Sequence, residues 1–231
     1  MRSNLNRLAQ FALSSLLLAV LAISTGCHSV GHNVAGSRPG ETPADALAQL
    51  QAGNRRFVEG RLNVRDVVAL RRATAGGQHP FAIVLSCIDS RCPAEVIFDQ
   101  GIGDIFSARV AGNVLDDDIL GSLEFACQVA GAKLIAVVGH SNCGAVKGAC
   151  SGVQLGHLTG LLAKIQPAVA ATTAPPGTPA QFQAVAEANV RRVLALIRES
   201  SPVLDGLIRR GEVGLVGGMY DLGGGEVQFF E

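Results

Sequence analysis

The sequence predicts an α/β fold: a mostly parallel central sheet flanked by helices, with an N-terminal helical arm and an antiparallel C-terminal edge strand. Short apolar runs that end in polar residues alternate with longer segments of helical periodicity. Two such runs, 105–111 and 133–139, are separated by an apolar helical segment at 119–130, and another buried run lies at 81–86. A strand, a helix and a second strand in this order form the right-handed crossover unit of a parallel sheet.

The other helices and strands are predicted from the periodicity of apolar residues and from the glycines or prolines at which each segment ends. Residues 43–60 show a helical apolar stripe that ends at Gly60, and we expect this arm to pack against the domain or a partner subunit. Three glycines at 223–225 turn a late strand into a final edge strand. The remaining expected elements are helices at 64–74, 94–99, 144–150, 155–169, 181–198 and 202–210, and strands at 105–111, 213–220 and 227–230.

Residues 1–26 have the pattern of a secretory signal rather than of a folded element. Two arginines precede an apolar run at 11–23, which is shorter than the ~20 residues of a spanning helix. Cys27 follows the small residue Gly26, and the stretch resembles a lipoprotein signal in which that cysteine is acylated. A plain signal peptide and an uncleaved anchor are the alternatives. We expect export to the periplasmic side of a bacterial membrane, a flexible tether at 27–42 and a single domain at 43–231.

The net charge of the chain argues against one class of partner, and its composition indicates how the core is built. The 231 residues contain 19 basic and 19 acidic side chains and no internal repeat. The leader holds two arginines and no acid, so the remainder has a formal charge of about −2, which argues against a nucleic-acid partner. There is no tryptophan, so the interior must be built from aliphatic side chains.

An exported chain with six cysteines would be expected to contain disulfides, but the positions of two of the cysteines suggest another role. Cys87 and Cys143 follow buried strands in polar settings, whereas Cys127 lies within an apolar helical pattern and is expected to be a core thiol. Cys92 and Cys150 have no assigned role. A disulfide among Cys92, Cys127 and Cys150 stays open at this stage.

Three metal ligands are expected to meet at one edge of the sheet. Cys87 ends the strand at 81–86, and His140 and Cys143 follow the strand at 133–139. The carboxyl ends of parallel strands meet at the same edge, so these side chains can converge there. Two thiolates and one imidazole can bind one Zn²⁺ per chain, and three protein ligands leave a position open for chemistry. The domain is therefore expected to be a zinc-binding catalytic domain.

A carboxylate and a guanidinium follow the first ligand at alternate positions. Asp89 could bind the metal or accept a hydrogen bond from a metal-bound water, and Arg91 can hold that carboxylate in a two-point pair away from the metal. Asp89 and Arg91 are thus the expected catalytic pair.

These motifs together resemble the β-class carbonic anhydrases. The resemblance begins with residues 87–91, Cys-Ile-Asp-Ser-Arg, and residues 140–144, His-Ser-Asn-Cys-Gly, and it covers nearly all of the chain after the leader. The further stretches that are similar to that family are 53–57, 109–113, 121–126 and 219–222.

The resemblance implies a zinc enzyme that interconverts carbon dioxide and bicarbonate through hydroxide on the metal, assembled as a homodimer or larger homo-oligomer. It implies that Gln78, which turn chemistry alone would make a surface amide, donates to a substrate oxygen. It also places Gly144 in the substrate pocket and Phe106 and Phe125 on its apolar wall, which suits an apolar substrate such as carbon dioxide.

Two other functions are open on the sequence alone. The same fold could hydrolyse carbon disulfide or carbonyl sulfide, or the chain could be a non-catalytic lipoprotein that binds zinc for folding or storage. Asp89, Arg91 and Gln78 argue against the second, because a structural zinc site has no use for them.

Overall fold

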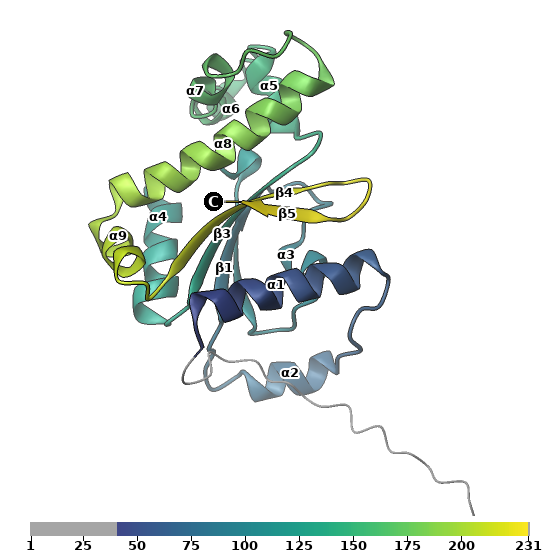
Figure 1. The fold of residues 1–231 in the computed structure, drawn as a ribbon, viewed down its shortest axis with the longest axis vertical. Helices are drawn as coiled ribbons and strands as arrows, with labels where there is room; N and C mark the ends of the chain where they lie inside the picture. The colour runs from purple at the N-terminus through teal and green to yellow at the C-terminus, as the bar shows by residue number, and fades with distance from the viewer. Residues whose placement is uncertain (1–40, 231) are drawn as a thin grey trace, which may run out of the picture. The chain divides into compact units, whose positions relative to one another are not determined.

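The computed structural model describes residues 41–230, so the expected leader, the tether and Cys27 lie outside the described residues. A five-stranded sheet has the order β2-β1-β3-β4-β5 (Figure 1). Four strands are parallel, and β5 pairs antiparallel with β4, as the sequence predicted. The strands are β1 (Ala82–Ser86), β2 (Ile105–Arg109), β3 (Leu134–His140), β4 (Gly214–Tyr220) and β5 (Val227–Phe230).

Helices cover both faces of the sheet. The long helix α8 lies across one face together with α4 and α9, and α1 lies on the other (Figure 1). The described helices are α1 (Pro43–Val58), α2 (Val67–Ala73), α3 (Ala94–Ile97), the 3-10 turn η1 (Ala111–Asn113), α4 (Asp117–Glu124), the π-helical turn η2 (Phe125–Val129), α5 (Gly144–Cys150), α6 (Gly156–Ala163), α7 (Gln166–Ala170), α8 (Pro179–Ser200) and α9 (Pro202–Arg209).

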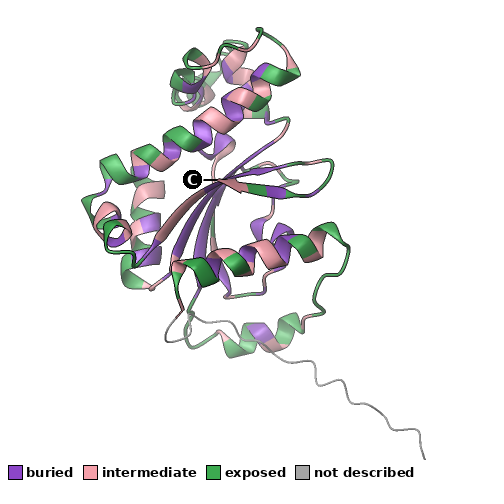
Figure 2. Ribbon diagram, in the orientation of Figure 1, coloured by how far each residue is buried: buried purple, intermediate pink, exposed green. Residues whose placement is uncertain are grey.

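The sheet separates two apolar cores. Every residue of β1 and β3 is buried, so these strands form the centre of the molecule (Figure 2). Alternate strand residues point to opposite faces. Leu85 and Val137 pack with Val190 of α8 in one core, and Val84 and Ala136 belong to the core under α1. The end of each central strand is therefore fixed from both sides.

The N-terminal arm packs on the sheet of its own chain. Thr42 and Asp45 form a reciprocal capping box at the start of α1. A Cβ at Gly53 would lie 1.7 Å from the carbonyl oxygen of Phe98, so only glycine allows this approach. The buried Asn54 amide donates to the carbonyl of Gly225 at 2.8 Å, which ties the arm to the turn before β5.

The structure corrects two expected helices. The segment 155–169 is not continuous: α6 ends at Ala163, and Pro167 lies in the first turn of the separate helix α7. The helix expected at 119–130 begins earlier and changes its hydrogen-bonding pattern at Phe125, where η2 follows α4. All five cysteines between residues 41 and 230 are free thiols, so the disulfide that the sequence left open is not formed. Within the same residues, the helices are all too short or too polar to cross a membrane.

Candidate metal centre

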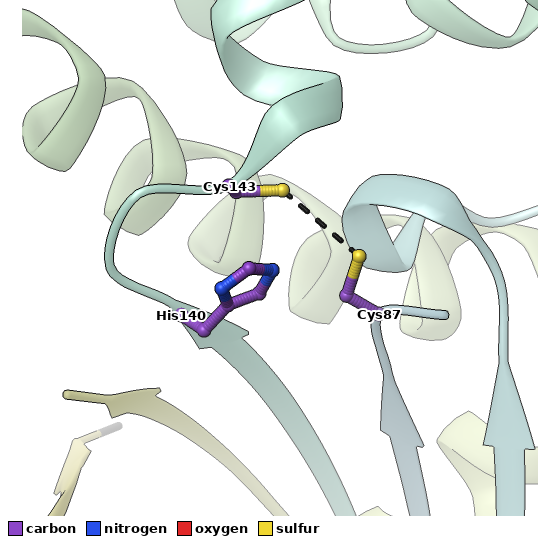
Figure 3. A group of neighbouring side chains, drawn as sticks. All are labelled: Cys87, His140 and Cys143. Atoms are coloured by element: carbon purple, nitrogen blue, oxygen red, sulfur yellow. Dashed lines mark hydrogen bonds between the residues drawn. The ribbon is translucent and has the colours of Figure 1, made fainter. Parts of the chain in front are cut away.

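Three buried side chains converge at the carboxyl edge of the sheet, as the sequence predicted. Cys87 directly follows β1, His140 is the last residue of β3, and Cys143 precedes α5. Their candidate ligand atoms all lie within 4.8 Å of one another. The two sulfurs and the imidazole face a common point (Figure 3).

The geometry of this cluster fits zinc. The Cys87 and Cys143 sulfurs are 4.0 Å apart, close to the ~3.8 Å that two Zn–S bonds of about 2.3 Å subtend in a tetrahedron. His140 Nδ1 lies 2.9 Å from the carbonyl oxygen of Ser141, which can only accept, so Nδ1 carries the proton. The Nε2 atom of His140 is buried and has no hydrogen-bond partner among the described residues. An imidazole nitrogen without a hydrogen-bond partner, beside two thiols, is the donor set of a metal site once a cation displaces the protons.

The two thiols titrate as a pair. Their mutual hydrogen bond lowers the pKa of Cys87, helped by the Gly112 N–H at 3.3 Å from its sulfur. The same contact with Cys87, and then burial, raises the pKa of Cys143. Burial disfavours the charged imidazole of His140, but contacts with the Cys87 and Cys92 thiols outweigh it and raise the pKa to about 10. The pocket therefore holds protons that a bound cation would displace.

Asp89 and Arg91 form a two-point ion pair beside the cluster. Arg91 Nε lies 2.9 Å from Asp89 Oδ1, and Nη2 lies 2.8 Å from Oδ2. This guanidinium holds the pKa of Asp89 well below its usual range. The Oδ2 atom is 3.9 Å from His140 Nε2, so the ionised carboxylate faces the metal ligands from the side.

A second arginine holds the backbone of the same loop. Arg109, the last residue of β2, donates from Nε to the carbonyl of Cys87 at 3.0 Å and from Nη2 to the carbonyl of Asp89 at 2.5 Å. The next residue, Val110, donates its N–H to the carbonyl of Ser86 at 3.1 Å. The end of β2 thus supports the end of β1 where the first ligand begins.

The structure does not bring all expected substrate residues to the cluster within one chain. Gln78 is exposed and precedes the amino end of β1, whereas Cys87 follows its carboxyl end, so the strand separates them. Phe106 and Phe125 meet edge to face, with ring centroids 6.1 Å apart, beside an open hollow that none of the three ligands lines. Gly144 is exposed at the start of α5, next to Cys143.

Sequence reasoning gave no role to several groups that contact this centre. The Asn189 amide on α8 is buried and donates to the carbonyl of Gly112 at 2.9 Å, which supports the turn whose N–H reaches the Cys87 sulfur. Gly112 has a φ of 66°, and a Cβ there would lie 2.7 Å from Ile165 Cδ1. Every residue has a backbone carbonyl, so the sequence does not indicate that Asn189 binds the carbonyl of Gly112. The glycine itself was the one available signal, because glycine adopts a positive φ readily.

Comparison with known proteins agrees with the geometry of the site. A family model for carbonic anhydrase matches residues 82–227. Carbonic anhydrase 2 of Mycobacterium tuberculosis is 37% identical over 196 residues, a match that covers 81% of this chain and 92% of the relative. The chain belongs to the carbonic anhydrase family. The carbonic anhydrase of Mycolicibacterium smegmatis is 34% identical over 199 residues and covers 82% of this chain and 94% of the relative.

Solved structures place this carbonic anhydrase in the β class by its fold. The β-carbonic anhydrase CafA of Aspergillus fumigatus is similar at a TM-score of 0.63 and 27% identity, with 81% of this chain and 90% of that chain covered. The β-carbonic anhydrase CcaA gives a TM-score of 0.66 at 24% identity, with 80% and 95% covered. The chain is thus an enzyme of the β-carbonic anhydrase family.

Proposed function

We propose that this enzyme hydrates carbon dioxide reversibly to bicarbonate and a proton, with one zinc held by Cys87, His140 and Cys143. The observation that carries the proposal is the ionised Asp89 carboxylate, paired with Arg91 and 3.9 Å from the imidazole of the ligand set. Cys87, His140 and Cys143 would hold the zinc, which would supply a Lewis acid able to lower the pKa of water. A purely structural site would have no need of a carboxylate kept ionised at its side.

The residues of the chain then have separate tasks. Asp89 accepts the hydrogen bond that orients the attacking oxygen, because an ionised carboxylate is an acceptor only. Arg91 keeps that carboxylate ionised and turned away from the metal, since it occupies both carboxylate oxygens. The burial of all three ligands excludes bulk water and strengthens these interactions.

A second copy of the chain is part of the proposal. Gln78 is exposed and lies across β1 from the metal ligands, so it reaches a substrate only from another copy. Phe125 is 51% exposed beside the hollow along β2, and such a side chain favours an apolar contact between copies. One of the solved relatives, from Sordaria macrospora, is described as a tetrameric β-carbonic anhydrase. We propose a homodimer or larger homo-oligomer, which sedimentation of the purified chain tests.

Stopped-flow hydration of carbon dioxide tests the activity. The zinc-loaded protein should accelerate hydration, and Asp89→Asn should lower kcat/KM by about 10–100-fold while one zinc per chain is retained. Asp205→Asn, which alters an ion pair between α8 and α9, is the matched control and should retain full activity. Hydrolysis of carbon disulfide or carbonyl sulfide with little hydration of carbon dioxide would instead support the alternative hydrolase. Zinc binding without either activity would support a storage or structural role.

We also propose that the enzyme acts on the periplasmic side of a bacterial membrane, attached by a lipid on Cys27. The support is the arginine, apolar run and cysteine pattern of residues 1–27, which the structure does not describe. Full-length protein should appear in the membrane fraction after processing that globomycin blocks, and Cys27→Ala should escape that processing. Recovery of the wild type as a freely soluble periplasmic protein would refute the anchor.

A further inference from the structure

The ion pair between Asp89 and Arg91 cannot by itself place the carboxylate beside the metal ligands. Both residues belong to one short loop after β1, and the hydrogen bond from the Cys92 N–H to the Asp89 carbonyl, at 2.9 Å, also closes within that loop. Cys87 and Cys92 at the ends of the loop are buried in the two cores, but Ile88 between them is 59% exposed, so apolar packing fixes the ends of the loop and not the residues between them. The ion pair and this hydrogen bond join residues of the loop to one another, so neither fixes the loop relative to the rest of the protein. Something outside it must set the distance from Asp89 to the cluster.

Arg109 provides that external anchor. It ends β2, and its backbone pairs in register with Ser86 of β1, so its position is set by the sheet. From there its side chain reaches the carbonyl of Cys87 at 3.0 Å and the carbonyl of Asp89 at 2.5 Å. One guanidinium thus spans the backbone of a metal ligand and the backbone of the paired carboxylate.

The chemistry of this contact needs arginine. The guanidinium presents donors in a fixed planar fork, whereas a lysine ammonium is a point donor on a flexible stem. Arg109 has no carboxylate partner within residues 41–230, so the two carbonyl groups are the acceptors for its charge. Hydrogen bonds from a charged donor are about twice as strong as neutral ones.

We propose that Arg109 is a positioning residue that fixes Asp89 relative to the metal ligands through the backbone of residues 87–89. Arg91 sets the ionisation and orientation of the carboxylate, and Arg109 sets its place. This assignment rests on the proposed function, because Asp89 matters for catalysis only if the site hydrates carbon dioxide.

Arg109→Ala, Arg109→Lys and the double variant Arg109→Ala/Asp89→Asn test the proposal in the full chain. Arg109→Ala should retain one zinc per chain and lose about 10–100-fold in kcat. Arg109→Lys should recover only part of the loss, because it cannot bridge both carbonyls. Added to Asp89→Asn, the Arg109 change should cost less than about threefold, since the group through which it acts is already gone.

Three results would show that Arg109 does not position Asp89. Wild-type kcat in Arg109→Ala, full recovery in Arg109→Lys, or an additive loss in the double variant would overturn the positioning role. Arg198→Ala, which removes an arginine from an ion pair between α8 and α9, is the matched control and should leave kcat unchanged.

A readout that does not depend on activity separates this proposal from the proposed function. Hydrogen–deuterium exchange of the peptide 86–92 should accelerate in Arg109→Ala, while exchange in α5 stays as in the wild type. Unchanged exchange at 86–92 would overturn the anchor even in an active enzyme. If the wild type does not hydrate carbon dioxide, the proposed function fails, and the exchange result still decides whether Arg109 holds the loop.

Discussion

Two buried polar clusters in this carbonic anhydrase differ in one respect. Around Asp99, whose side chain is 1% exposed, every carboxylate oxygen has a partner. Around Cys87, His140 and Cys143, the buried Nε2 atom of the imidazole has no hydrogen-bond partner within residues 41–230. A buried polar atom without a partner costs free energy, and natural proteins keep such atoms where a ligand will satisfy them. The cluster around Asp99, here called the closed cluster, is complete within the chain. The cluster of Cys87, His140 and Cys143, here called the open cluster, has a donor set that a metal ion would complete.

The closed cluster holds the arm and the loop after it to the domain. Asp99 pairs with Arg56 of α1 and with Arg65, and the side-chain amide of Asn63 donates to it at 2.8 Å. Asp99 has a φ of 46°, a backbone conformation that Asp and Asn tolerate better than most residues. All these partners come from residues 56–65, so the cluster fastens that segment to the end of α3.

Breaking the open cluster should have the largest effect. Cys143→Ser removes one of two thiolates, and we expect loss of bound zinc and of all measurable hydration, because the hydroxyl is a poor ligand for this metal. Cys150→Ser on the same helix is the matched control and should keep one zinc per chain. Metal analysis after dialysis measures both. Full zinc retention in Cys143→Ser would refute the ligand assignment.

Breaking the closed cluster should cost stability and not chemistry. Asp99→Asn keeps the shape and the backbone preference but leaves two half-buried arginines without a counter-charge, and it should lower the free energy of unfolding by about 3 kcal/mol. In a chain of this size that corresponds to a fall in Tm of roughly 6–12 °C. Asp205→Asn, in a more exposed ion pair, should cost about 1 kcal/mol or less. An unchanged Tm in Asp99→Asn would show that the cluster does not hold the arm.

Removing Arg91 should open the pair beside the metal without emptying the site. In Arg91→Ala, the Asp89 carboxylate loses both donors and can turn toward the metal, so we expect a loss of about 10–100-fold in kcat/KM with zinc retained. A cobalt-substituted sample should show a changed visible spectrum if the carboxylate becomes a ligand. Activity comparable to the wild type would contradict the role of the pair.

Acid should weaken the closed cluster gradually. Burial raises the pKa of Asp99, but hydrogen bonds from Arg65 and Arg56 outweigh it, and the net shift is below the ordinary value. The unfolded chain therefore binds the proton first, so the contribution of Asp99 is complete above about pH 4 and is lost as the pH falls through the folded-state value. Urea unfolding between pH 5 and pH 3 should show the stabilities of the wild type and Asp99→Asn converging. A constant difference would contradict this sign.

The sequence predicted the parts of the molecule that depend on periodicity and on strand ends. The buried apolar runs predict β1 and β3, and the parallel pairing of these strands predicts that Cys87, His140 and Cys143 lie together. The alternate spacing of Asp89 and Arg91 likewise predicted their pair. These features are local, or they follow from the topology of a parallel sheet.

The parts that the sequence did not predict depend on contacts between distant backbone atoms. Asn54 and Gly225 are 171 residues apart, and Arg109 binds carbonyl groups that every residue possesses, so neither contact has a sequence signature. The break between α6 and α7 was missed because the apolar pattern continues through Pro167. The resemblance to the family implied a substrate contact for Gln78. It did not show that Gln78 lies across β1 from the metal ligands of its own chain.

We propose that the open cluster becomes an active carbon dioxide hydratase when one metal ion completes it. The direct measurement is the stopped-flow rate of carbon dioxide hydration as the metal-free protein is titrated with zinc. The rate should rise linearly to one equivalent per chain and then remain constant. A rate that stays at the uncatalysed value at every zinc concentration, or that does not depend on zinc, would refute zinc-dependent hydration at this site.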